Sequence, residues 1–142
     1  MVVLYKYKDL VYKIIGAAMT VHKELNWGLV EPIYQECLSL ELTDMGIHHQ
    51  REVELLCTYK NHTLEKRYRM DFVVGDIILE LKAVSKITPE HRSQLCNYLR
   101  LTGKPLGLLI NFGDDHLVGE RWAYDMETNE CFVVDRNMQP VD

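Results

Sequence analysis

The sequence contains no pair of cysteines at metal-binding spacing. Structural zinc sites and iron–sulfur clusters use closely spaced cysteines or histidines, so both are excluded. Each cysteine has apolar neighbours, which favours small buried core residues in a reduced protein over a redox role. The four cysteines stand singly along the 142 residues: Cys37, Cys57, Cys96 and Cys131.

Long hydrophobic runs are also missing. No apolar stretch approaches the roughly 20 residues needed to cross a bilayer, and the N-terminal segment lacks the apolar stretch and cleavage site of a secretory signal. Repeats, low-complexity tracts and Gly/Ser/Pro linkers are absent as well. We therefore expect one cytoplasmic domain over residues 1–142, with a core at about 9–112, a C-terminal hairpin extension at 113–142 and no membrane partner.

A surplus of positive charge is a third feature that the sequence lacks. Sixteen Lys and Arg residues face 21 Asp and Glu residues, for a formal net charge of -5. This balance excludes a protein that binds nucleic acid mainly by bulk positive charge. Eight of the acids lie in residues 113–142, where there are only two bases, so the rest of the chain is nearly neutral. Binding at a local site therefore remains open.

Hydrophobic periodicity predicts a sheet with helices packed on it. Apolar residues at helical spacing indicate helices over residues 9–25, with Asp9 as N-cap, and 31–45, and Thr88-Pro89 begins a third helix that ends before Gly103. Period-two alternation and apolar runs indicate strands over 53–59, 64–74, 77–84 and 105–112, with a turn at Asn61-His62 and a final hairpin over 121–134. The order ααβββαβββ predicts an α/β or α+β fold.

The predicted hairpin around Gly75-Asp76 brings two acids together. If these are the two loop residues, the numbers of opposed residues add to 151, and Asp71 lies directly opposite Glu80. Opposed Cβ atoms are roughly 4.5 to 5.5 Å apart, where like charges are destabilising unless a positive charge lies between them. Two carboxylates at this spacing suit Mg²⁺, which takes oxygen ligands.

The same register leaves a second interpretation of these charges. It sets Lys82 opposite Arg69, so Asp71 and Glu80 could instead pair with these bases in an exposed charge ladder. However, Glu80 and Lys82 interrupt the run IILELKAV, which is otherwise apolar on both faces. A solvated ladder is not expected there, so the context favours a functional site.

These residues belong to a longer pattern that resembles the PD-(D/E)XK nuclease superfamily, and within it the GxxExxY proteins of the RecB-like branch. The resemblance covers residues from about 14 to 112, including RYRMDFVV, ELKAV, QLCNYLRLTG and LLINF. It implies a restriction-endonuclease-like αβββαβ core with a mixed sheet. The pattern consists of Gly28, Glu31 and Tyr34 as G-x-x-E-x-x-Y, then Asp71, Glu80-Leu81-Lys82, Gln94 and Tyr98.

The resemblance also implies roles for single residues. Lys82 would orient the attacking water and stabilise charge on the phosphate, and Gln94 would contact that phosphate or its water. Without the motif, Glu31 would be an ordinary acid at a helix N-terminus. Together Glu31, Asp71, Glu80, Lys82 and Gln94 form the expected catalytic set, in which the metal ligands are Asp71, Glu80, the Leu81 main-chain carbonyl and Glu31.

Several tyrosines and bases are candidates for substrate binding. Tyr34 and Tyr98 each have core packing as the alternative. The basic stretch could follow a phosphate backbone, or it could be a solvated strand edge. The candidates are Tyr34, Tyr98, Lys66, Arg67 and Arg69.

The resulting expectation is a Mg²⁺-dependent nuclease, with Mn²⁺ as the substitute metal and DNA as the expected substrate. Hydrolysis would occur by in-line attack of a metal-activated water. The alternative is a non-catalytic module of the same fold that binds nucleic acid or protein, because a fold does not fix a function. A homodimer and an unidentified protein partner both remain open.

Overall fold

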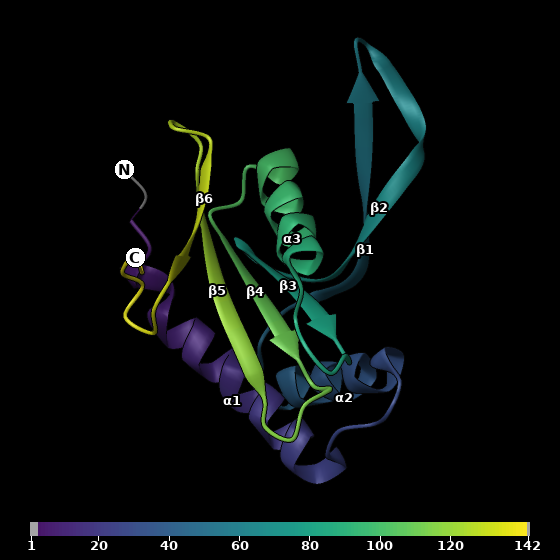
Figure 1. Ribbon diagram of the computed structural model, residues 1–142, viewed down its shortest axis with the longest axis vertical. Coiled ribbons are helices and arrows are strands. Elements are labelled where there is room, and N and C mark those ends of the chain that lie inside the picture. The colour runs from purple at the N-terminus through teal and green to yellow at the C-terminus, as the bar shows by residue number, and fades with distance from the viewer. Residues whose placement is uncertain (1–2, 142) are drawn as a thin grey trace.

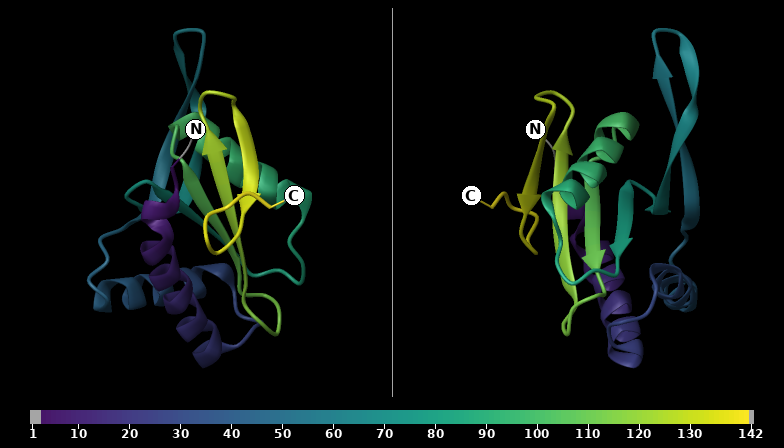
Figure 2. Two further views of the ribbon diagram at one scale, coloured as in Figure 1. Left: turned by 90° about the vertical axis from the view of Figure 1, so that its left-hand side faces the viewer. Right: turned by 45° about the vertical axis from the view of Figure 1, so that its right-hand side comes forward.

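The computed structural model describes residues 3–141 and contains a mixed six-stranded sheet with helices on both faces. The strands are ordered β1-β2-β3-β4-β5-β6 across the sheet. Only the central pair, β3 and β4, is parallel, and α3 connects these two strands. Helices α1 and α2 cover one face and α3 covers the other (Figure 1 and Figure 2). The predicted fold class is confirmed.

The helices begin and end close to the predicted positions. The expectation that Asp9 caps the first helix is wrong, because that helix continues a 3-10 turn in which the Lys8 N–H already bonds to the Tyr5 carbonyl. Thr88 caps the third helix as predicted, since its hydroxyl accepts from the His91 N–H. The bounds are η1 Tyr5–Tyr7, α1 Lys8–Leu25, α2 Glu31–Asp44 and α3 Pro89–Thr102.

The strands are longer than predicted at the edges of the sheet and shorter at its centre. The first turn lies one residue earlier than predicted, at Lys60 and Asn61, whose φ angles of 49° and 35° suit a type I′ turn. The third strand ends at Lys82 rather than at Val84. The bounds are β1 Gln50–Tyr59, β2 His62–Val74, β3 Ile77–Lys82, β4 Leu106–Asn111, β5 Val118–Asp125 and β6 Glu130–Val134.

The core lies on both faces of the central strands. All residues of β4, and all of β3 except Lys82, are buried, as the continuous apolar runs predict. One cluster packs α1 and α2 against the sheet around Ile14, Leu38 and Phe72. A second cluster packs α3 against the other face around Ile78 and Leu95. The sheet is therefore fixed from both sides where β3 ends.

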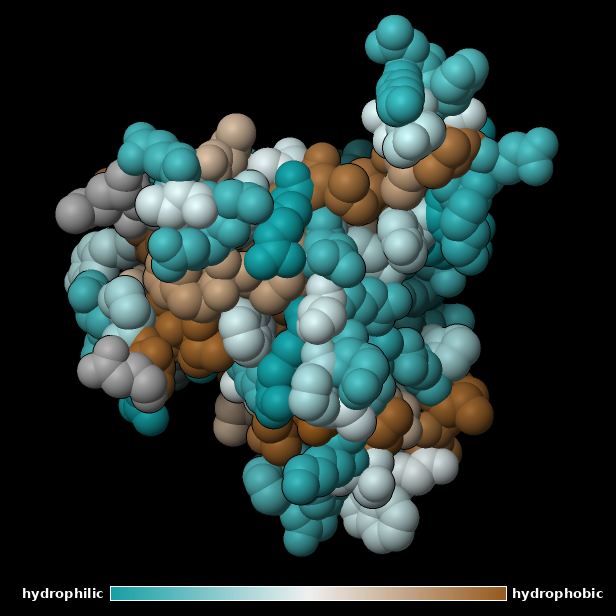
Figure 3. All heavy atoms as spheres, turned by 45° about the horizontal axis from the view of Figure 1, so that its top comes forward, coloured by the Kyte–Doolittle hydropathy of each residue, from teal (hydrophilic) through white to brown (hydrophobic). Residues whose placement is uncertain are grey.

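The outer part of β1 and β2 forms a hairpin arm, residues 53–69, that projects from the body. Every β2 residue from 62 to 69 is exposed, whereas Met70 and the residues from 72 to 74 are buried. Figure 3 shows the arm with a hydrophilic tip and hydrophobic side chains below it. The ladder is irregular between Leu56 and Thr58, and such irregularities bend a strand pair. Because β2 pairs with β3 only from Phe72 onward, the arm separates from the rest of the sheet just before Asp71.

The segment that follows β3 is attached to the end of β4 by a buried asparagine. Asn111 is 1% exposed, and its side chain accepts from the Val84 and Gly113 N–H groups at 3.0 Å and donates to the Val84 carbonyl at 2.8 Å. A Cβ at Gly113 would lie 2.2 Å from the Val84 carbonyl oxygen, so only glycine fits there. These contacts fix the chain directly after Lys82.

The cysteines depart from the sequence-based expectation. Cys96 on α3 and Cys131 on β6 form a disulfide, so the expectation of a fully reduced protein without redox chemistry is wrong for this pair. The two residues meet because Cys96 is buried on α3 and Cys131 packs against the cluster that α3 covers. Cys37 and Cys57 are free and half-buried rather than fully buried.

Among residues 3–141, no helix has both the length and the apolar character needed to cross a membrane.

Candidate active site

Asp71 lies where β2 separates from β3. Val74 pairs with Ile77 and Phe72 with Leu79, as the predicted register requires, and the ladder between β2 and β3 ends there. At the next position the Asp71 carboxylate accepts the Leu81 N–H at 2.8 Å. The side chain of Asp71, rather than the main chain of β2, thus accepts this hydrogen bond from β3. Burial raises the pKa of Asp71, and this hydrogen bond acts in the opposite direction.

Glu80 is a buried acid beside Asp71. It is 4% exposed, and its Oε1 atom is buried with no hydrogen-bond partner among the described residues. Burial and, after it, the negative charge of Asp71 raise the pKa of Glu80 to about 8, although Lys82 opposes both effects. Without a bound cation, Glu80 is therefore mostly protonated at pH 7. This burial disagrees with the alternative interpretation, in which Glu80 is part of an exposed charge ladder.

Lys82 connects Glu80 to α3. Its ammonium donates to Glu80 Oε2 at 3.3 Å and to Gln94 Oε1 at 3.1 Å, and its side chain is 13% exposed. The predicted opposition of Lys82 and Arg69 is wrong, because β2 has already separated from β3 and Arg69 faces Glu52 and Glu54 on β1. The structure therefore places Lys82 and Gln94 in direct contact.

Glu31 approaches the same acids from α2. It is the first residue of that helix, with Val30 at the N-cap, and it is half-buried. Burial raises the pKa of Glu31, and the charges of Lys82 and Asp71 also act on this pKa, in opposite directions. Three acids therefore lie in one electrostatic environment: Glu31 from α2, Asp71 from β2 and Glu80 from β3.

Gln35, one turn after Glu31, holds Asp71 from the helix side. Its side-chain amide donates to Asp71 Oδ1 at 3.3 Å, and its carbonyl accepts from the Arg51 guanidinium at 3.1 Å. Gln35 is 7% exposed. Gln35 belongs to none of the sequence motifs, although its i+4 spacing from Glu31 puts both residues on one face of the helix.

Replacing Gln35 with leucine should weaken divalent metal binding. The substitution keeps a side chain of similar size at this buried position but removes the amide that orients Asp71. Such supporting contacts are worth about 10- to 100-fold in metal affinity. Mn²⁺ titration monitored by thermal unfolding measures this change. Ser39→Ala, one turn further along α2, removes only a hydrogen bond to His49 and should leave the affinity unchanged. Equal affinities for wild type and Gln35→Leu would contradict the assignment.

Both candidate tyrosines have structural contacts. Tyr34 is fully buried, stacks on Phe112 with ring centroids 4.7 Å apart, and donates to the Asn26 carbonyl. Tyr98 is 2% exposed, and its hydroxyl donates to the Arg69 carbonyl at 3.4 Å. Burial raises the pKa of Tyr98, and the charges of Glu80 and Asp71 raise it further. Tyr98 is therefore close enough to Glu80 and Asp71 to be affected by their charges. The contacts of both tyrosines favour the packing interpretation.

The basic candidates lie on the hairpin arm rather than among the acids. Arg67 pairs with Glu54 at 3.1 Å, and Arg69 also faces Glu54 across the arm. Exposed pairs of this kind contribute little to stability. Lys66 is exposed and lies near the irregular part of the ladder. The arm thus presents bases beside the site, two of them already paired with acids.

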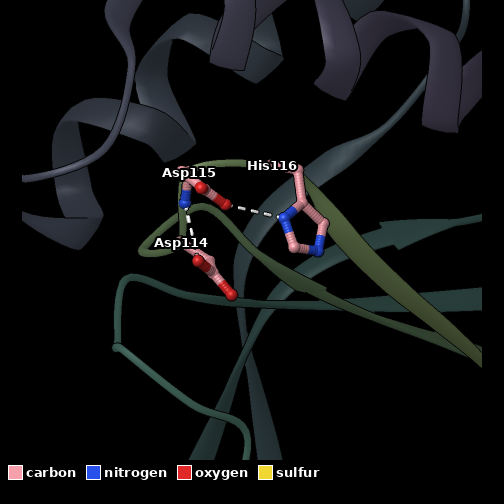
Figure 4. A group of neighbouring side chains, drawn as sticks. All are labelled: Asp114, Asp115 and His116. Carbon is pink, nitrogen blue, oxygen red and sulfur yellow. Dashed lines mark hydrogen bonds and ion pairs between the residues drawn. The ribbon is translucent and has the colours of Figure 1, made fainter.

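One group of potential metal ligands lies elsewhere, in the loop between β4 and β5. One ligand atom from each of Asp114, Asp115 and His116 lies within 4.8 Å of the others (Figure 4). The His116 ring contacts Asp115 at 2.7 Å, and the Asp115 N–H donates to Asp114. Asp115 and His116 are exposed. The three residues satisfy one another, so the loop is explained without an ion.

The comparison with protein families gives a match over residues 8–122 to the model described as the PD-(D/E)XK nuclease superfamily. The chain belongs to this superfamily. Among curated proteins, none is significantly similar to it. A solved structure titled "Crystal structure of SSO0001" is similar in fold, with a TM-score of 0.55 and 16% sequence identity. That match covers 96% of this chain and 62% of the other, so the chain spans less than two thirds of the length of that protein.

The superfamily uses divalent metals, and the acids of this member suit such an ion. The buried Glu80 Oε1 atom lacks a hydrogen-bond partner within residues 3–141, and Asp71 beside it presents a second carboxylate. Oxygen ligands of this type are the ones that Mg²⁺ and Mn²⁺ take. A cation here would also remove the repulsion that favours protonated Glu80.

This member of the superfamily also carries a positioning residue that sequence reasoning missed. Asn111 ends the apolar run of β4 and fixes Val84, two residues after Lys82. A polar residue that ends an otherwise apolar strand was the available signal, because a buried amide needs partners. The partners themselves follow only from the parallel pairing of β3 with β4.

Proposed function

We propose that the protein is a metal-dependent nuclease that hydrolyses phosphodiester bonds, with DNA as substrate. The observation that carries this proposal is the buried Glu80, which lies between Asp71 and Lys82 with one carboxylate oxygen unsatisfied among the described residues. A structural role alone would not require a buried acid beside a second, half-buried one, because burying a charge without a partner is costly. A binding module has no need of this arrangement.

In this proposal, Mg²⁺ or Mn²⁺ is held by Asp71, Glu80, the Leu81 main-chain carbonyl and Glu31. When bound, the ion supplies charge stabilisation at the phosphate and a more acidic water. The Asp71 carboxylate is oriented for this role by the Leu81 N–H and by Gln35. Glu80 must release its proton to take part, so its protonation controls metal binding.

Lys82 and Gln94 act on the phosphate and the attacking water. The Lys82 ammonium is held by Glu80 and Gln94 and is largely screened from solvent, where a fixed positive charge stabilises developing negative charge most effectively. Gln94 orients Lys82 through its side-chain oxygen and also interacts with Tyr98, and its amide would donate to a phosphate oxygen or a water. The two residues thereby supply positioning and electrostatic stabilisation, which are what hydrolysis of a phosphodiester mainly requires.

We also assign the chain to the GxxExxY group of the RecB-like branch. The support is the motif of Gly28, Glu31 and Tyr34. Gly28 has a φ of 108°, which favours glycine. The Tyr34 hydroxyl accepts from the Leu29 N–H as well as donating to Asn26. The glycine and the tyrosine thus shape the loop before α2, and Glu31 starts that helix facing the other acids.

The test is incubation of the protein with labelled single- and double-stranded DNA and RNA, in Mg²⁺, Mn²⁺ or EDTA. We expect cleavage of DNA that requires a divalent ion and stops in EDTA. Binding without cleavage under every condition would favour the non-catalytic alternative, for which the net charge of -5 gives little electrostatic support. Cleavage that persists in EDTA would overturn the metal assignment.

A further inference from the structure

Arg121 is a partly buried cation that has no hydrogen-bond or ion-pair partner among the described residues. It lies on β5 two residues before Ala123, which packs in the cluster against α1, so both side chains are on the α1 face of the sheet. Its Nε atom is buried with no hydrogen-bond partner, and the guanidinium makes no ion pair with any residue from 3 to 141. Arginine at a partly buried position normally has a carboxylate or carbonyl partner, because its donors otherwise lose their hydration.

The neighbouring charges compensate Arg121 only in part. Asp135 is the acid that acts on it, but one oxygen of this carboxylate already accepts the N–H groups of Asn137 and Gln139, at 2.8 and 3.0 Å. That turn also carries Arg136. Burial lowers the pKa of Arg121, and the like charge of Arg136 lowers it further. Two arginines and one acid therefore act on one another here, which leaves a net positive charge.

These side chains line one cavity of about 500 Å³ between the start of α1 and the turn after β6. Its wall contains three bases, Lys8, Arg121 and Arg136, and one acid, Asp9. The Lys8 ammonium lies over the Tyr5 ring, 5.5 Å from its centroid. The cavity is therefore net positive and contains at least one buried donor that lacks an acceptor.

We propose that this cavity binds a phosphate group, with Arg121 and Arg136 as its main ligands. The planar fork of an arginine matches two phosphate oxygens, and such charge-assisted hydrogen bonds are among the strongest in proteins. Three bases against one acid suit a doubly charged phosphate better than a single carboxylate. Binding would give the buried Nε donor an acceptor and would reduce the repulsion between the arginines.

This phosphate site is separate from the candidate active site. Lys82 contacts Gln94 on α3, so the active-site lysine is on the α3 side of the sheet. Arg121 faces α1 on the opposite side. Phosphate binding in this cavity does not depend on nuclease activity, so it can be measured in EDTA, where no metal-dependent cleavage occurs. The phosphate could be free or could belong to the end of a nucleic acid, and the probes below distinguish these sources.

The test is thermal unfolding of the full chain in EDTA with increasing inorganic phosphate, at ionic strength matched with KCl. The wild type should show a saturable rise in Tm, because a ligand of the folded state stabilises it by mass action. Arg121→Met should lower the affinity for phosphate about tenfold or more, the scale of a charge-assisted hydrogen bond. Without phosphate, Arg121→Met should be at least as stable as the wild type, because it removes an unpaired charge.

Arg100→Met is the matched control, since Arg100 is an exposed arginine on α3, and it should keep the full response to phosphate. Arg136→Gln, an exposed position, repeats the test if Arg121→Met does not fold. A short oligonucleotide with and without a 5′-phosphate identifies the source: a response that needs the terminal phosphate assigns the site to a nucleic-acid end, and a response to inorganic phosphate alone assigns it to the free ion. No saturable response beyond KCl, or an equal response in Arg121→Met, would overturn the proposal.

Discussion

Glu80→Gln should lower metal-dependent cleavage by about a thousandfold or more while leaving the protein folded. Removing a single stabilising group from an active site typically costs about 10²- to 10³-fold in rate, and this change also removes a proposed metal ligand. The amide resembles the protonated acid that a pKa of about 8 gives in the metal-free protein. Stability at pH 7 should therefore change little, so the loss of rate reports on the site itself.

Lys82→Met should cause a loss of similar size. It removes the ammonium that contacts Glu80 and Gln94 but keeps most of the side-chain volume. Lys86→Met is the matched control, because Lys86 is exposed four residues further along the chain. Rates are compared by single-turnover cleavage at saturating Mn²⁺, with folding checked by thermal unfolding. Wild-type rates in Glu80→Gln or Lys82→Met would mean that this cluster is not the catalytic site.

The stability of the metal-free protein should fall as the pH rises from about 4.5 to about 8. In the unfolded chain Glu80 loses its proton near pH 4.5, whereas the folded protein holds that proton up to a pKa of about 8. The folded state therefore binds more protons across this window, and its free energy of unfolding decreases with increasing pH. Each pKa unit corresponds to about 1.4 kcal/mol, so the total fall amounts to a few kcal/mol. Urea unfolding in EDTA at several pH values measures it.

The same experiment on Glu80→Gln isolates the contribution of this residue. Burial also raises the pKa values of Glu31 and Asp71, so some pH dependence should remain in the variant. The difference between the two proteins should grow with pH and level off above pH 8. The affinity of the wild type for Mn²⁺ should increase as the pH rises over the same interval, because the metal competes with the proton for Glu80. Parallel stability curves for wild type and variant would show that Glu80 is not held protonated.

The hairpin around Gly75-Asp76 shows how far sequence reasoning reaches. A two-residue turn fixes the register of its flanking strands, so the pairing of Phe72 with Leu79 followed from simple counting. The end of that ladder did not follow. It depends on the Asp71 carboxylate accepting the Leu81 N–H, which competes with strand pairing and leaves no trace in the alternation of polar and apolar residues.

Contacts between distant segments account for the remaining differences. Gln35 and Asp71 are far apart in the sequence and meet only once α2 packs on the sheet. The disulfide likewise needs the register of the last hairpin and the position of α3, neither of which cysteine spacing can reveal. Local patterns predicted the elements and the acids of the site, whereas the residues that support those acids depend on tertiary packing.

The hydrogen bonds of Asn111 bear on the timescale at which the candidate site can rearrange. The amide protons of Val84 and Gly113 are both donated to the buried Asn111 side chain, and the Phe112 amide donates to the Lys82 carbonyl. Their exchange with solvent thus requires the central parallel strands to open, which is the rarest class of opening in a folded protein. The backbone that carries Lys82 is therefore already set before a substrate arrives, and the side chains, together with the hairpin arm, remain the parts able to adjust.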